Sequence, residues 1–198
     1  MDARERSAAR RQAVNEAVMR IRAIETAQGV TRRSLEDIKQ VLIELAQKKE
    51  LFPLEDFTNP GGGETKANAL FRLHEDDDHR FALYGQMSTE PRESPPHDHT
   101  VWAVVVGMYG EELNKLYDHH EGGVAQKGEV MVKDGAGVAL MPEDLHSIHM
   151  DAKEPVLNFH MYGLGLEQLH GRRYYRPATH DWKHYPASDG IQDLPEPA

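Results

Sequence analysis

The chain has 198 residues, of which 33 are Asp or Glu, 23 are Lys or Arg, and none is Cys. Its formal net charge of −10 opposes binding to nucleic acid and to anionic membranes. The absence of cysteine excludes disulfides, thiolate metal sites and a cysteine nucleophile. The N-terminus lacks the apolar core of a signal peptide, and no run of about 18 apolar residues predicts a membrane span. We therefore expect a soluble, cytoplasmic protein with one main domain.

Two amphipathic helices are predicted at the N-terminus. Between residues 5 and 26 the apolar side chains recur at helical spacing, and Gly29 ends the pattern. A second helix begins near Ser34, where Ser34 and Asp37 resemble a capping signal, and runs to about residue 48. We expect both helices to cover one side of the domain. The alternative is that their apolar stripes contact a partner subunit.

The pattern of apolar residues changes after Pro53, Pro60 and the glycine run at 61–63. Short segments typical of strands follow near 69–74, 81–87, 101–109, 113–117, 124–132, 138–141, 146–150 and 156–162. Eight strands separated by turns, without alternating helices, predict a β-sandwich or barrel. The proline-rich segment from residue 177 is expected to wrap the surface or to fray.

A pair of histidines indicates a metal site. His97 and His99 are two residues apart in an extended stretch, so their imidazoles project to the same side. His146 is the best candidate for a third ligand, because a predicted strand and a tight turn at Pro142 precede it. Imidazole binds zinc, copper, iron and nickel alike, so these residues predict a transition metal without naming it. A chance His-x-His among 12 histidines is the alternative.

The order of these motifs resembles the two motifs of the cupins. The first motif is matched by His97, His99 and Gly110, and the second by Gly137, Pro142 and His146. The glutamate that is usual in the first motif is missing, since its expected place is occupied by Ala103, Val104 and Val105. A site with three histidines and no carboxylate is similar to that of the thiol dioxygenase branch.

The resemblance to bacterial cysteine and 3-mercaptopropionate dioxygenases covers about residues 70–162. The segments that carry it are Leu73-His74-x-Asp76, Arg80-Phe81, 96–102, Asp144-Leu145-His146 and His160-x-Tyr162-Gly163. It implies a mainly β fold, the cupin double-stranded β-helix or jelly-roll barrel, at 51–176. Residues 1–50 would form a helical extension packed on the barrel, and 177–198 a C-terminal tail.

The same resemblance implies a mononuclear non-haem iron(II) enzyme, either a monomer or a homodimer. It would oxidise a small thiol, such as cysteine or 3-mercaptopropionate, with O₂ to a sulfinic acid. Two rival functions remain open. A three-histidine cupin dioxygenase could cleave a carbon–carbon bond in a diketone or an aromatic acid, and a metal-bound cupin could sense a small ligand without catalysis.

The family's Ser-x-His-x-Tyr network appears here as Asn158-x-His160-x-Tyr162, which implies a catalytic role for these three residues. Asparagine also donates and accepts hydrogen bonds, but it is longer than serine. His160 and Tyr162 would hydrogen-bond the substrate and set protonation states. The alternative is a buried histidine bonded to a buried tyrosine with no other role.

A substrate carboxylate favours an arginine, whose planar fork binds both oxygens. Arg72 is near the position at which the animal cysteine enzymes have such an arginine. Arg172 and Arg173 are near the position that resembles the bacterial mercaptopropionate type. Single-residue gaps decide between these three candidates for substrate binding, so all three stay open.

Overall fold

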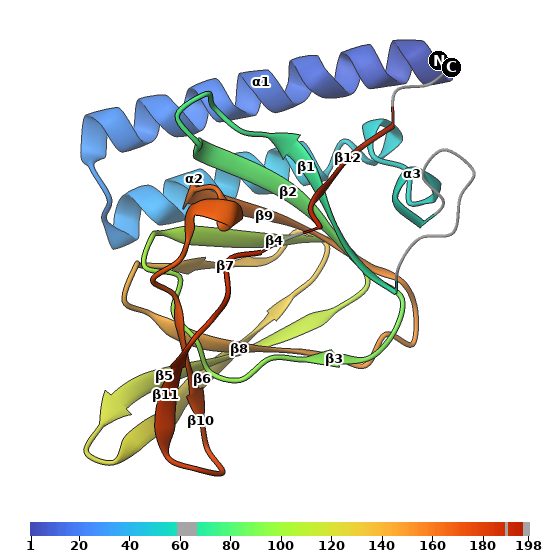
Figure 1. The fold of residues 1–198 in the computed structure, drawn as a ribbon. Helices are drawn as coiled ribbons and strands as arrows, with labels where there is room; N and C mark the ends of the chain where they lie inside the picture. The colour runs from blue at the N-terminus through green and yellow to red at the C-terminus, as the bar shows by residue number, and fades with distance from the viewer. Residues whose placement is uncertain (59–66, 189, 196–198) are drawn as a thin grey trace.

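The computed structural model describes residues 1–58, 67–188 and 190–195 (Figure 1). Pro60 and the glycine run at 61–63, which the sequence analysis takes as part of the boundary between helices and strands, lie outside the described residues. Two long helices, α1 (Ala3–Gln28) and α2 (Arg32–Ala46), begin the chain, as the apolar spacing predicts. The cap of α2 is Thr31, whose side chain accepts from the Ser34 N–H, so the prediction of a cap at Ser34 is wrong by one turn. None of the described helices is long and apolar enough to cross a membrane.

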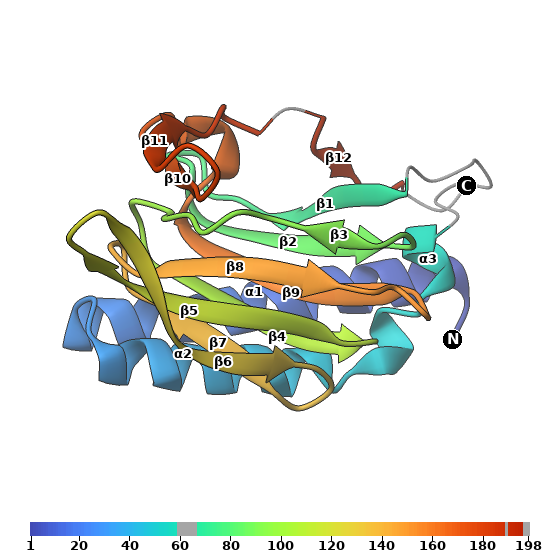
Figure 2. The same cartoon turned by 90° about the horizontal axis from the view of Figure 1, so that it is seen from below.

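Two β-sheets face each other after the helices (Figure 2). The six-stranded sheet has the order β12-β1-β2-β9-β4-β7 and the four-stranded sheet the order β3-β8-β5-β6. The strands of the first sheet are β1 (Asn68–His74), β2 (Arg80–Ser88), β4 (Ala103–Tyr109), β7 (Gly137–Leu140), β9 (Val156–Leu164) and β12 (Gln192–Asp193). Those of the second are β3 (Arg92–Glu93), β5 (Glu112–His120), β6 (Gly123–Val132) and β8 (Leu145–Met150).

The connectivity of β2 to β9 defines the fold. Along the chain the strands alternate between the two sheets, except at the β5–β6 hairpin, and β9 returns to lie between β2 and β4. This arrangement is the jelly roll, in which closed pairs of hairpins form two facing sheets. The expected double-stranded β-helix with helices at its N-terminus is therefore confirmed.

Short elements complete the chain. A single turn of 3-10 helix at Lys49–Leu51 and helix α3 (Glu55–Thr58) lead into the barrel, and another 3-10 turn at Leu166–Gln168 follows β9. The strands β10 (Arg173–Arg176) and β11 (Asp181–His184) form a separate hairpin. The segment expected as a C-terminal tail, 177–198, thus contributes two strands. Strand β11 pairs with β10, and β12 pairs in parallel with β1.

The six-stranded sheet is buried on both faces. Helix α2 contacts β4 and β7, and both helices pack over the outer face of the sheet (Figures 1 and 2). Because side chains alternate along a strand, Leu157, Phe159 and Met161 of β9 join the helix-side core. The residues between them, Asn158, His160 and Tyr162, face the interior of the barrel, where Tyr162 packs with a second apolar cluster. This alternation places polar chemistry inside the barrel.

Candidate metal centre

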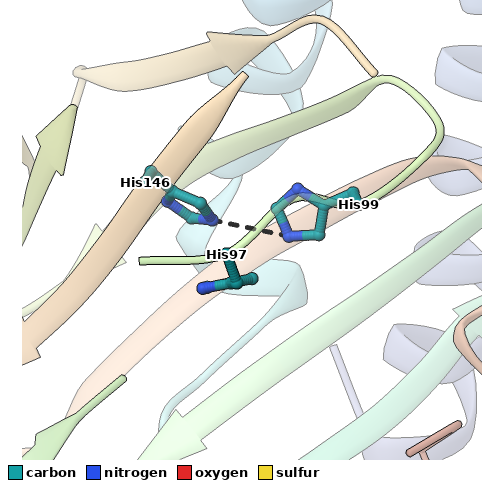
Figure 3. A group of neighbouring side chains, drawn as sticks. All are labelled: His97, His99 and His146. Atoms are coloured by element: carbon teal, nitrogen blue, oxygen red, sulfur yellow. Dashed lines mark hydrogen bonds between the residues drawn. The ribbon is translucent and has the colours of Figure 1, made fainter. Parts of the chain in front are cut away.

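Three histidines meet in the barrel interior (Figure 3). The backbones of His97 and His146 pair directly, with N–H to carbonyl distances of 2.9 and 3.1 Å, which holds their rings 4.5 Å apart. His99 lies, like His97, in the connection between β3 and β4, and its Nε2 lies 3.4 Å from Nε2 of His146. One nitrogen atom of each ring lies within 4.8 Å of the corresponding atoms of the other two, and all three residues are buried. The structure thus brings together the three histidines predicted as metal ligands.

In two of these rings, those of His97 and His146, hydrogen bonds leave the inner nitrogen atom free to bind a metal. Nδ1 of His97 lies 2.9 Å from the Pro95 carbonyl oxygen, which can only accept, so the proton is on Nδ1 and the lone pair is on Nε2. Nδ1 of His146 contacts Oδ1 of Asn114 at 2.7 Å in the same way. Burial lowers the pKa of His97 to about 4 and lowers those of His99 and His146 well below 6.5. Three neutral imidazoles with free lone pairs fit a transition-metal ion.

A buried carboxylate stands behind the histidines, and sequence reasoning missed it. Oε1 of Glu112 accepts from Nδ2 of Asn114 at 2.7 Å, and its Oε2 accepts from Nδ2 of Asn158 at 2.8 Å. A continuous chain of hydrogen bonds therefore runs from His146 through Asn114 to Glu112. Burial raises the pKa of Glu112, while the bonds from both asparagines lower it in part. Glu112 and Asn114 are two residues apart on β5 and so share one face of the strand, a spacing that could have indicated a polar pair inside the barrel. The predicted strand began at residue 113 and therefore left Glu112 out.

The expected Asn158–His160–Tyr162 network is divided in the structure. Nδ1 of His160 lies 3.1 Å from the Tyr162 hydroxyl, whereas Asn158 bonds to Glu112. Burial lowers the pKa of His160 to about 3 and raises that of Tyr162, so both are neutral. If Tyr162 donates to Nδ1, the Nε2–H of His160 has no partner; in the other tautomer the tyrosine hydroxyl proton is free. Either way, the pair keeps one donor for another molecule.

The histidines border a cavity of about 250 Å³. Its walls include His97, His99, His160 and Tyr162, together with 185–188 of the C-terminal segment. Four buried nitrogen atoms of its lining residues lack a hydrogen-bond partner among the described residues: Gln86 Nε2, His99 Nδ1, His160 Nε2 and Arg172 Nε. Buried polar atoms without partners are rare and costly, so a cavity with four of them is suited to a polar ligand.

The structure separates the three arginines predicted to bind substrate. Arg172 borders the cavity, where its guanidinium bonds to the Pro186 carbonyl at 3.0 Å and stacks over Tyr185 at 5.2 Å. Arg72 does not line the cavity, because it forms ion pairs with Glu75 and Glu167.

Arg173 is half exposed and holds Asp98, which accepts from its backbone N–H at 2.9 Å and its guanidinium at 3.3 Å. Asp98 therefore points away from the histidines and anchors β10. Arg172 alone of the three predicted arginines reaches the cavity. A further arginine that the sequence analysis did not single out, Arg92, also lines it.

Comparisons with known proteins found likeness in fold alone. No protein-family model matches the sequence, and a search of curated proteins found no match. A Cupin_2 domain of an XRE family transcriptional regulator from Enterobacter cloacae is 19% identical, with 49% of this chain and 96% of that chain covered and a TM-score of 0.37. An uncharacterized protein with a double-stranded β-helix domain from Klebsiella pneumoniae is 14% identical, covering 63% and 96%, with a TM-score of 0.44.

A hydroquinone 1,2-dioxygenase in complex with Cd²⁺ and 4-hydroxybenzonitrile is 13% identical, covering 53% of this chain and 68% of that chain, with a TM-score of 0.40. Likenesses this distant carry no argument about activity, and the strand order decides the fold. The chain has the cupin fold. The function of this chain must be argued from its own cavity.

Proposed function

We propose that this cupin is a mononuclear non-haem iron(II) thiol dioxygenase, which oxidises a small thiol with O₂ to a sulfinic acid. The observation that carries the proposal is the group His97, His99 and His146, buried and neutral, with no carboxylate among the three. Neutral ligands leave a divalent metal its full charge, which favours binding of a thiol as thiolate. The motifs similar to those of thiol dioxygenases add support.

The chain's own residues would bind and orient the substrate. Iron(II), held by the three histidines, would supply the O₂ chemistry and a position for the sulfur. The fork of Arg172 would bind a substrate carboxylate, since its Nε has no partner among the described residues. His160 and Tyr162 would donate one hydrogen bond to the substrate. Both oxygen atoms add to sulfur, so that RSH and O₂ give RSO₂H with no further reactant.

The size of the cavity agrees with a small substrate. Its 250 Å³ lies below the roughly 300–1,000 Å³ of most ligand pockets, so a molecule with few non-hydrogen atoms would fill it.

O₂ uptake by anaerobically iron-loaded protein tests the proposal. Cysteine, 3-mercaptopropionate, cysteamine and mercaptosuccinate would each be offered, with products identified by mass. Uptake matched by a gain of two oxygen atoms on one thiol supports the proposal. A His97→Ala variant should lose both iron and uptake, whereas a variant of the exposed His170, His170→Ala, should keep both. Bound iron without any thiol oxidation would reject the proposal; uptake with a diketone or an aromatic acid would then favour carbon–carbon cleavage, and tight binding without turnover a sensor.

A further inference from the structure

Besides Arg172, a second arginine borders the cavity, and this one has no partner among the described residues. Arg92, on the short strand β3, lines the cavity, and within the described part of the chain its side chain makes no hydrogen bond or ion pair. Other arginines near the barrel are neutralised by acids, as Arg72 is by Glu75 and Arg176 by Asp181. In a chain with ten more acidic than basic residues, an unpaired guanidinium at a cavity wall indicates an anion that comes from outside.

The two cavity arginines come from different parts of the fold. Arg92 belongs to the four-stranded sheet, whereas Arg172 directly precedes β10 and is held by the C-terminal segment. Both arginines line the cavity that His97, His99 and His160 also line.

A ligand with one carboxylate would satisfy only one of these cations. The other guanidinium would stay unpaired while the bound ligand displaced water from it, which disfavours the complex. A ligand with two carboxylates pairs with both cations, and the unpartnered Nε2 of Gln86 offers a further neutral donor in the same cavity. The small volume restricts such a ligand to a short carbon chain.

We propose that the cavity selects a small dicarboxylate, with one carboxylate on Arg172 and the other on Arg92, and that the substrate is a thiol of this class, such as mercaptosuccinate. The inference that the substrate is a thiol rests on the proposed function. The inference that the ligand has two carboxylates rests on the two arginines alone. Arg92 is then the residue that discriminates a dicarboxylic from a monocarboxylic thiol.

Binding without turnover tests the two-carboxylate part. Succinate and propionate, which carry no thiol, would be titrated into zinc-loaded protein by calorimetry at constant ionic strength. Succinate should bind at least tenfold more tightly than propionate. Arg92→Gln should remove that preference and leave propionate binding unchanged, whereas Arg172→Gln should weaken both. Arg20→Gln, a change on the exposed face of α1, is the control and should alter neither.

Turnover then separates the two proposals. With iron loaded, kcat/KM for mercaptosuccinate should exceed that for 3-mercaptopropionate at least tenfold, and Arg92→Gln should bring the two values together. A succinate preference that depends on Arg92, without oxidation of any thiol, would reject the dioxygenase and retain the dicarboxylate site.

Thiol oxidation with a substrate preference that Arg92→Gln leaves intact would reject the dicarboxylate site and retain the dioxygenase. Circular dichroism checks that the variant is folded. If Arg92→Gln is not folded, Arg92→Lys replaces it in the experiment, since lysine keeps the charge but lacks the planar fork. Arg92→Lys should reduce the preference for the dicarboxylic thiol in part, and an unchanged preference would again reject the dicarboxylate site.

Discussion

Glu112 offers the most direct test of how the barrel interior holds its histidines. Glu112→Gln keeps the shape of the side chain but removes its negative charge. The new glutamine has one oxygen and one NH₂ group where Glu112 has two oxygens. With its oxygen toward Asn114, its NH₂ group faces Nδ2 of Asn158, and two donors then meet. Rotation of the Asn158 amide would relieve this, because its Oδ1 has no hydrogen-bond partner in the described part of the wild-type chain. We therefore expect a small loss in the free energy of unfolding, about 1 kcal/mol, the worth of roughly one hydrogen bond.

The expected effect on metal binding is larger than the effect on folding. Glu112 orients Asn114, and Asn114 in turn fixes the proton of His146 on Nδ1. Residues that orient a metal ligand in this way typically contribute 10- to 100-fold to metal affinity, which corresponds to about 1.4–2.8 kcal/mol. Competition between the protein and a chelator for Co²⁺ or Fe²⁺ measures this affinity, and nitrogen NMR reports the tautomer of His146.

Glu111 provides a matched control for this experiment. It precedes Glu112 in the chain but is exposed, so Glu111→Gln makes the same chemical change without touching the hydrogen-bond chain. We expect wild-type metal affinity for this variant. Equal affinities for Glu111→Gln and Glu112→Gln would refute the reasoning that Glu112 acts on the metal ligands through Asn114.

Three further predictions concern stability. Asn158→Ser removes the amide that donates to the buried carboxylate and should destabilise by about 1–3 kcal/mol in urea unfolding; an unchanged midpoint would contradict that bond. Burial lowers the pKa of His97 to about 4, so that on acidification the unfolded chain binds a proton at this histidine before the folded chain does. The free energy of unfolding of metal-free protein should therefore fall by about 1.4 kcal/mol per pH unit for such a histidine as the pH drops from 6.5 to 4. Thermal unfolding at pH 7 and 5 measures this, and equal midpoints would exclude it. Gly107→Ala would place a Cβ 2.4 Å from Cα of Lys133 and should cost about 1–3 kcal/mol, whereas Gly128→Ala meets no atom within 4 Å and should be the milder change.

Elements with a clear apolar period were predictable from the sequence. The two N-terminal helices and eight of the strands, β1, β2 and β4 to β9, follow from spacing alone, because each buries one face or both. Strand β3 has only two residues, which is too short for any alternation to be visible. Strand β12 exists through its pairing with β1, more than a hundred residues earlier, and no local pattern encodes that partner.

The candidate site was predictable where local motifs define it. His97 and His99 share a side because of their spacing, and the turn at Pro142 indicated His146. Partners across the barrel were not predictable. Nothing near Asn158 in the sequence shows that it bonds to Glu112 from another strand, and the choice of Arg172 over the other candidates depends on where the chain runs after β9.

Strand β9 also has a consequence for the N-terminal helices. Phe159 packs against Phe52 on the helix side of the sheet, one residue away from His160 on the cavity side. Since a strand transmits a shift of one side chain to its neighbours, loosening of the helix layer would displace His160 and Tyr162 together. The helix layer therefore supports, from behind the sheet, the strand whose inner face borders the cavity. A chain shortened to begin at β1 would expose the apolar face of β9 to water and lose the rigidity that keeps its inner face in place.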